Sequence, residues 1–226
     1  MNMPEIKIAI ATNINFYEKT LPVIISSLRA NGIPDEMIYI FNGGYEEEAQ
    51  TKFDGISYYQ LTHNSYEYSP LIEIVEKEIQ SEYWFLMHDT CKVGPRFKEL
   101  LYANIPADRP EKIALTHRPA MSMGLYRYDY LISIKNKILQ IKNTDFSEEK
   151  MQWWKAWGVP NEDYFLWLHK PLPRLPVAPH HMQFIAYENW YGTDSVRRSE
   201  YFGGFDIYKS KSNWGQTSGG IMIRHI

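Results

Sequence analysis

The stretch Ile6-Lys7-Ile8-Ala9-Ile10-Ala11-Thr12 decides the fold, because it is an apolar run of strand length that ends in polar residues. Amphipathic stretches with helical spacing separate it from other runs of the same kind. Strands that alternate with helices need crossover connections, so the sequence predicts an α/β fold, a mostly parallel sheet flanked by helices. The further expected strands are residues 37–41, 56–61, 83–87 and 113–116.

Local signals place two of the expected helices. Thr20 can cap the first, Pro22 is tolerated in its opening turn, and Gly32 ends it. Ser69-Pro70 opens the second. The residues that share an apolar face are Leu21, Ile24, Ile25 and Leu28 in the first helix, and Leu71, Ile74, Val75 and Ile79 in the second.

Composition excludes several classes of protein. The 24 basic and 27 acidic side chains give a formal charge of −3, and duplex nucleic-acid binding needs a basic surplus, so we expect no nucleic-acid partner. The single cysteine, Cys91, cannot form an internal disulfide, and we expect an inert buried thiol. No apolar run approaches the ~20 residues that span a bilayer. These features predict a cytoplasmic protein without a transmembrane segment.

The second half of the chain differs in character. Six of the seven tryptophans follow residue 150. We expect a capped helix over 147–157, another beginning at Asn161, and an extended segment over 170–180, where four prolines exclude regular structure. The polar, glycine-rich stretch from Lys209 to Gly220 suggests a mobile loop or lid as readily as plain disorder.

Ligands of open parallel sheets bind at the carboxyl ends of the strands, so the residues just after each strand are candidates. Thr12 and Asn13 follow the first strand, Asn42 the second, and His88 with Asp89 the fourth. The chain has neither a GxxxxGK[ST] phosphate loop nor a GxGxxG after its first strand, which disfavours ATPases and ordinary dinucleotide enzymes. Asp89 suits a hard cation that bridges two phosphates, although it also suits the start of a turn.

Later residues complete the candidate set. Glu162 and Asp163 stand at a helix start, where the dipole alone explains carboxylates and where one carboxylate can also serve as a general base. His180 or His181 can add one imidazole to a metal site. Arg127 can pair with a phosphate or simply face water.

The order of these features resembles the nucleotide-sugar glycosyltransferases of the GT-A fold, particularly family 2. The opening strand with Thr12-Asn13 resembles their uridine-contacting loop, and residues 24–32 with 38–44 resemble the helix and second strand that follow. Residues 83–90 occupy the place of their aromatic fourth strand with its metal motif. The acidic pair within Pro160–Leu166 resembles that of their acceptor half.

The resemblance implies a single domain over 1–226, with a nucleotide-sugar-binding half over about 1–120 and an aromatic-rich acceptor half over about 121–226. It implies a UDP-sugar donor, a glycan or other hydroxyl acceptor, and inversion with Asp163 as base and Glu162 in support. The nucleotide would contact Thr12, Asn13, Asn42, His88, Asp89 and Arg127, and a manganese or magnesium ion would be held by Asp89 with His180 or His181.

Two departures keep alternatives open. Asn42 stands where the family usually has an acidic residue, and the metal motif has one carboxylate instead of two or three. A non-catalytic module of the same fold that binds carbohydrate or a protein partner is therefore the second hypothesis. A sugar-nucleotide pyrophosphorylase ranks last, because no glycine- and arginine-rich loop follows the first strand.

Overall fold

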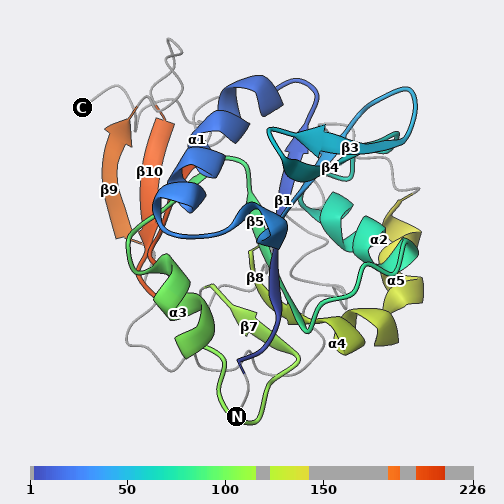
Figure 1. The fold of residues 1–226 in the computed structure, drawn as a ribbon. Helices are drawn as coiled ribbons and strands as arrows, with labels where there is room; N and C mark the ends of the chain where they lie inside the picture. Colours follow the sequence, from blue (N-terminus) through green and yellow to red (C-terminus); the bar gives the residue numbers. More distant parts are fainter. Residues whose placement is uncertain (1–2, 116–122, 143–182, 189–196, 212–226) are drawn as a thin grey trace, which may run out of the picture.

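The computed structural model describes residues 3–115, 123–142, 183–188 and 197–211 of the chain. Within them the central feature is a seven-stranded sheet (Figure 1). In spatial order its strands are β3 (Ala49–Phe53), β4 (Ile56–Leu61), β2 (Ile38–Gly43), β1 (Ile6–Asn13), β5 (Tyr83–His88), β8 (Gly124–Arg127) and β7 (Lys112–Ala114).

This sheet is mixed, with a parallel centre. β4, β2, β1 and β5 pair in parallel, whereas the ladders β3–β4, β5–β8 and β8–β7 are antiparallel. The α/β class is thus confirmed, and the expected parallel arrangement holds for the four central strands of the described sheet. Its outer ladders depart from that expectation: β3–β4 and β7–β8 join strands that are consecutive in the chain, and β8 also runs antiparallel to β5.

Helices cover both faces of the sheet. α1 (Tyr17–Ala30) and α3 (Phe97–Ala103) pack on one face, and α2 (Ser69–Glu76) with α4 (Tyr128–Ser133) and α5 (Lys135–Ile141) on the other (Figure 1). Two short 3₁₀ turns, η1 (Asp35–Met37) and η2 (Tyr66–Tyr68), lie in connections. The expected apolar stripe of α1 is buried, and α2 opens at Ser69-Pro70 as predicted.

Alternating side chains of the central strands supply two cores. Ile8 and Ile10 of β1 point to the face that carries α1, and Ala9 points to the face that carries α2. In β5, Phe85 points to the face that carries α1, and Trp84 points to the face that carries α2. A strand buried on both sides is a continuous apolar run, which is why the sequence pattern revealed these strands.

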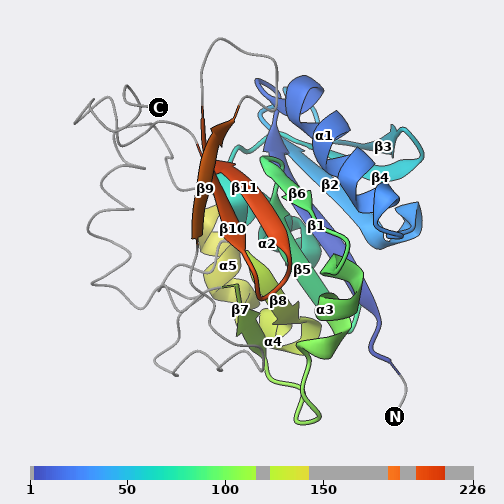
Figure 2. The ribbon, with the colours of Figure 1, turned by 90° about the vertical axis from the view of Figure 1, so that its left-hand side faces the viewer.

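A second, antiparallel sheet of β6 (Cys91–Val93), β11 (Ile207–Lys211), β10 (Arg197–Phe202) and β9 (Gln183–Glu188) lies beside α1 and α3 (Figure 2). Its β6 directly follows the end of β5, so it attaches to the carboxyl side of the central sheet. The prediction of a loop from Lys209 onward is wrong for Lys209–Lys211, because these residues pair in β11.

The local expectations differ from the structure in two further ways. α1 begins at Tyr17, so Thr20 lies inside the helix and does not cap it, and its hydroxyl donates to Asp89. β3, β6 and the strands β8 to β11 were not predicted; β3 is polar and β6 has three residues. The expected helices near 147–157 and 161, the proline-rich segment and the late tryptophans lie outside the described residues. No helix among the described residues has the length and apolar character needed to cross a bilayer.

Candidate functional site

The strand order creates a switch point between β1 and β5. From β1 the chain passes to β2 and then β4 on one side, after which it crosses to β5 on the other. In open α/β sheets, ligands bind outside the carboxyl ends of the strands at such a point. The loops after β1 and β5 therefore form the first place to look for a site.

Asp89 is held firmly at this point. Its backbone N–H donates to Ala11 O at 3.1 Å, which extends the pairing of β1 with β5 by one residue. Its Oδ2 accepts hydrogen bonds from Thr12 Oγ1 and Thr20 Oγ1, each at 2.7 Å. All three side chains are buried. Two hydroxyl donors on one oxygen fix the orientation of the carboxylate.

A small open pocket lies beside Asp89. Its volume is about 90 Å³, and it is lined by Ala11, Thr12, Asn13, Glu67, His88 and Asp89. Asn13 Oδ1 accepts from the N–H of Asn15 at 3.0 Å, which shapes the loop after β1. Typical small-molecule pockets begin near 300 Å³, so this one suits a phosphate-sized group, and a nucleotide sugar would extend beyond it.

Glu67 is a lining residue that sequence reasoning missed. It lies in η2, just before α2, and reaches the pocket from the connection between β4 and β5. A lone glutamate among tyrosines carries no local signal. The one feature that could have identified Glu67 as a lining residue is that its segment follows the carboxyl end of β4.

His88 joins the pocket to the second sheet. Its Nδ1 lies 3.0 Å from Nζ of Lys209 in β11. An ammonium group only donates, so Nδ1 of His88 is the acceptor in this contact. This contact links residues 121 positions apart and has no counterpart in the sequence pattern.

The pocket fits a divalent cation only in part. Two carboxylates, Asp89 and Glu67, line it. Magnesium often uses one or two carboxylates together with substrate phosphates, so this pair suits such an ion. The described part of the chain contains no cluster of three or more His, Cys, Asp or Glu that could hold a metal by itself.

Two predicted nucleotide-binding residues lie away from the pocket. Asn42 is fully buried, and its Nδ2 donates to the hydroxyls of Tyr58 and Tyr45, the latter at 3.2 Å. Its short side chain therefore completes the packing between β2 and β4. Asn42 does not line the pocket.

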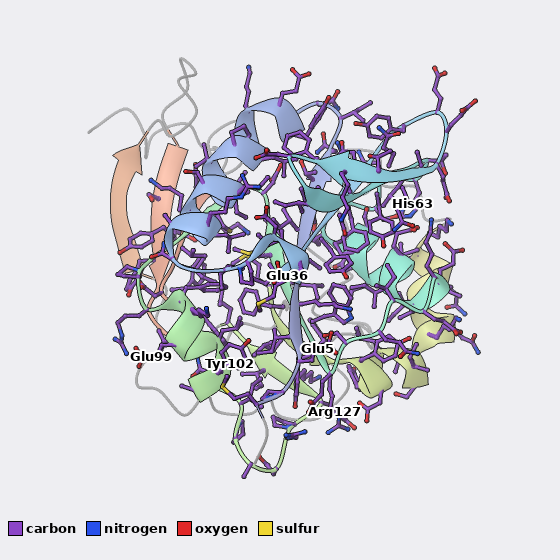
Figure 3. The ribbon with its side chains drawn as sticks, in the orientation of Figure 1. Glu5, Glu36, His63, Glu99, Tyr102 and Arg127 are labelled. Atoms are coloured by element: carbon purple, nitrogen blue, oxygen red, sulfur yellow. The ribbon has the colours of Figure 1, made fainter. Side chains whose placement is uncertain are left out.

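The expectation that Arg127 contacts the nucleotide is also wrong for this pocket, because Arg127 lies at the other end of the sheet. It pairs with Tyr83, at the amino end of β5, and six residues of strand separate that end from Asp89, roughly 20 Å at about 3.3 Å per residue. Its guanidinium contacts Asp129 Oδ1 at 2.6 Å and the carbonyl of Arg109. Figure 3 shows Arg127 at the lower end of the molecule, whereas β1 points to the upper end. From there Arg127 cannot meet a phosphate at Asp89.

The remaining predicted residues, Glu162, Asp163, His180 and His181, lie outside the described residues. Their roles as base, supporting carboxylate and metal ligands stay predictions.

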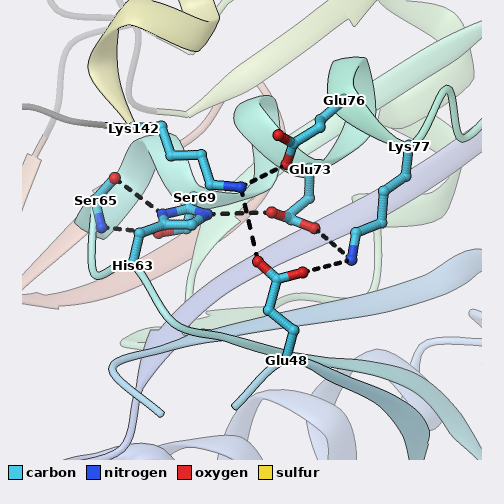
Figure 4. Close-up of polar contacts among 8 residues, drawn as sticks. All are labelled: Glu48, His63, Ser65, Ser69, Glu73, Glu76, Lys77 and Lys142. Carbon is cyan, nitrogen blue, oxygen red and sulfur yellow. Dashed lines mark hydrogen bonds and ion pairs between the residues drawn. The ribbon is translucent and has the colours of Figure 1, made fainter. Parts of the chain in front are cut away.

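A second polar cluster involves Ser65, His63 and Glu73. His63 Nδ1 lies 3.0 Å from Ser65 Oγ, and its Nε2 lies 3.1 Å from Glu73 Oε1 (Figure 4). The order of hydroxyl, imidazole and carboxylate is that of a nucleophilic triad. However, Ser65 is only 1% exposed and does not line the pocket, so its hydroxyl has no access to substrate. We interpret the cluster as structural.

Cys91 is buried, with its Sγ 3.6 Å from Met123 Sδ. Burial raises the pKa of its thiol to about 12. The expected burial of the thiol is confirmed, and a raised pKa without access disfavours a nucleophilic role.

Comparison with known proteins adds no relative: no protein-family model, no curated protein and no solved structure matches this chain.

Proposed function

We propose that this protein is a GT-A-type glycosyltransferase that moves a sugar from a nucleotide diphosphate, UDP in the first instance, to a hydroxyl of a glycan or other acceptor. One observation carries the proposal: the pocket at the switch point between β1 and β5 is lined by Thr12, Asn13, His88 and Asp89. These are the residues that the resemblance implies for the donor, and the pocket position is the one that sheet topology favours for a nucleotide.

In this proposal Thr12 and Asn13 lie by the nucleobase side of the donor, and Asp89 and Glu67 face its diphosphate. A manganese or magnesium ion bound to these carboxylates would neutralise charge on the leaving diphosphate. Thr12 and Thr20 keep the Asp89 carboxylate in one orientation. Asp163 would take the proton of the acceptor hydroxyl with support from Glu162. The acceptor oxygen would then bond to the anomeric carbon from the face opposite the diphosphate as the bond to the diphosphate breaks, and the outcome would be inversion.

The proposal includes a cytoplasmic location and no nucleic-acid partner. A single buried cysteine makes the fold independent of disulfides, and the formal charge of −3 offers no general attraction to polyanions.

Isothermal titration with UDP and a UDP-sugar in the presence of manganese tests the donor site. We expect binding to the wild type and at least a tenfold weaker affinity in Asp89→Asn, because a charged ligand of the cation is lost. Asp108→Asn, an exposed aspartate in a turn, is the matched control and should bind as the wild type does. A folded wild type that binds no nucleoside diphosphate would contradict the proposal.

The second candidate is a non-catalytic binding module of the same fold. It is favoured by the absence of a three-ligand metal cluster among the described residues. Donor hydrolysis separates the two functions: release of UDP by the wild type but not by Asp163→Ala supports the enzyme. Tight UDP binding without any hydrolysis or transfer supports the module.

A further inference from the structure

Residues 62–68 form an arm that connects β4 to α2 and carries Glu67 to the pocket. The arm leaves β4 at the carboxyl edge of the central sheet, and its η2 turn packs against β1. The other five lining residues belong to β1 or to the end of β5, where sheet pairing holds them. The place of the Glu67 carboxylate depends instead on how the arm is held.

A buried pair of side chains anchors the arm to α2. His63 Nε2 lies 3.1 Å from Glu73 Oε1, and the two side chains are 8% and 0% exposed (Figure 4). On its other side the imidazole contacts Ser65, with Nδ1 3.0 Å from Oγ. Separation of the arm from α2 would leave a buried carboxylate without one of its partners, which is costly. The pair therefore holds His63, and with it the arm, against the helix.

Hydrogen bonds within the arm extend this anchor to Glu67. The N–H of Tyr68 donates to Ser65 O at 3.0 Å, which closes the turn that contains Glu67. The N–H of Ser65 donates to Ser69 Oγ, at the start of α2, at 3.2 Å. The residues on either side of Glu67 are thus fixed to each other and to the helix, and His63 contacts the first of them.

The arm also lies directly on the end of β2. A Cβ atom at Gly43 would lie 2.7 Å from His63 O and 3.1 Å from Asn64 Cα, and the first distance is shorter than a side chain tolerates. Glycine is therefore required at this position for the arm to approach so closely. Gly43 is paired in register with Asn13, which lines the pocket. The arm is held against β2 at one strand's distance from the pocket.

We propose that the arm is a fixed support that places the Glu67 carboxylate against the bound donor, and that His63 and Glu73 are positioning residues for Glu67. The inference rests on the proposed function and deepens it, because it gives the buried cluster around Glu73 a role at the donor site. Neither His63 nor Glu73 needs to touch the donor, since both act through the arm.

A double-mutant cycle measures whether His63 acts through Glu67. With manganese present, Glu67→Gln should weaken UDP binding at least about tenfold, since a charged contact is lost, and His63→Leu at least about threefold. In a Glu67→Gln background, His63→Leu should cause less than about a twofold further loss, because the group that it positions is already absent. An undiminished effect of His63→Leu in that background would overturn the inference, as would normal UDP binding by Glu67→Gln.

Lys77→Met is the matched control, because it separates positioning from a loss of stability. Lys77 Nζ also contacts Glu73 at 3.1 Å, but Lys77 lies outside the arm. This variant should be less stable and still bind UDP within about twofold of the wild type. Equal losses of UDP affinity in Lys77→Met and His63→Leu would count against positioning.

Gly43→Ala tests the arm without a change to the buried charges. The added methyl group displaces the arm from β2, so we expect UDP affinity to fall at least about threefold. The loss should again shrink to less than about twofold in a Glu67→Gln background. Wild-type affinity in folded Gly43→Ala would show that the close approach of the arm does not position Glu67.

Hydrogen exchange of the ligand-free protein tests the anchor without any donor. In His63→Leu we expect the N–H groups of Ser65 and Tyr68 to exchange at least about tenfold faster relative to those of β1, because the arm opens locally. An equal acceleration in the arm and in β1 would overturn the inference, since His63 would then stabilise the whole fold and not the arm.

The outcomes separate this inference from the proposed function. If UDP binds to the wild type but Glu67→Gln, the cycle or the exchange rates give the contrary result, the inference alone fails and the donor site stands. If the folded wild type binds no nucleoside diphosphate, the proposed function fails and the inference fails with it.

Discussion

At the scale of single residues, Asp89 depends on two hydroxyl groups. Thr20→Val keeps the shape of the side chain but removes one donor to Oδ2, so we expect the free energy of unfolding to fall by about 1–3 kcal/mol. Thr20→Ser keeps the donor and should cost less than the valine variant. Urea denaturation measures both, with Thr51→Val on exposed β3 as the control. Equal losses for valine and serine would contradict the role of this hydrogen bond.

Cys91 offers a test of burial at the same scale. Because burial raises the pKa of its thiol to about 12, almost none is thiolate at pH 8, and the side chain has no exposed surface. We expect no reaction of the native protein with a thiol-labelling reagent and one labelled cysteine per chain in denaturant. Rapid labelling of the native protein would show that the second sheet opens readily.

Individual residues also show where sequence reasoning ends. Asp89 was predicted because it follows a buried strand, and strand ends define crevices. Thr20, Glu67 and Lys209 were not, because each reaches the site through a contact that only the fold creates: Thr20 lies 69 positions from Asp89, and Lys209 lies 121 from His88. The prediction for Arg127 failed for the opposite reason: a guanidinium suits a phosphate, but β8 places Arg127 beside Tyr83, at the amino end of β5.

At the scale of elements, the sequence predicts what is buried on both faces. β4 has the predicted bounds, and β1 and β5 each extend one residue further. β3 was missed because only one neighbour pairs with it and its residues are polar and mostly exposed. β10 and β11 were missed because charged residues interrupt them, and antiparallel pairing with distant strands stabilises them instead. Local propensity cannot represent such pairing.

The network around α2 makes a prediction about an element. Glu73 is fully buried, and its carboxylate contacts His63 Nε2 and Lys77 Nζ, each at 3.1 Å (Figure 4). On the same helix, Glu76 Oε2 contacts Lys142 Nζ at 2.7 Å. Burial raises the pKa of Glu73, but the hydrogen bonds from His63 and Lys77 lower it by more, so the net shift is downward. The charged form of Glu73 therefore stabilises the attachment of α2.

We expect Glu73→Gln to lower the free energy of unfolding at pH 7 by about 2–4 kcal/mol, since a buried charge pair loses one member. Because the folded pKa lies below the ordinary value of 4.5, this stabilisation is present above that pH and is lost as the pH falls through the folded value. Urea denaturation from pH 7 to pH 3 should thus show a flatter pH dependence in Glu73→Gln than in the wild type.

Glu76→Gln is the matched control, because Glu76 lies on the same helix but its side chain is 38% exposed. An exposed ion pair contributes under about 1 kcal/mol, so this variant should stay near the wild type at all pH values. If both variants lose the same stability, the effect belongs to helix α2 in general and not to the buried carboxylate.

At the scale of the whole molecule, the site exists only when both sheets are formed. β1 supplies Thr12, Asp89 follows directly after β5, α1 supplies Thr20, and β11 of the second sheet supplies Lys209. An unfolded chain has no such arrangement, so a ligand of the pocket binds the folded state alone and must stabilise the entire protein by mass action.

This linkage gives a global prediction. At a UDP concentration of 100 times its Kd, with manganese present, the stabilisation is about 2.7 kcal/mol. For a chain of this size each kcal/mol raises the Tm by about 2–4 °C, so the shift should be about 5–11 °C. Manganese without UDP supplies the baseline, and Asp89→Asn should show a much smaller shift at the same UDP concentration. A full shift in Asp89→Asn would place the nucleotide elsewhere on the molecule, because the carboxylate between β1 and α1 would then contribute nothing to its binding.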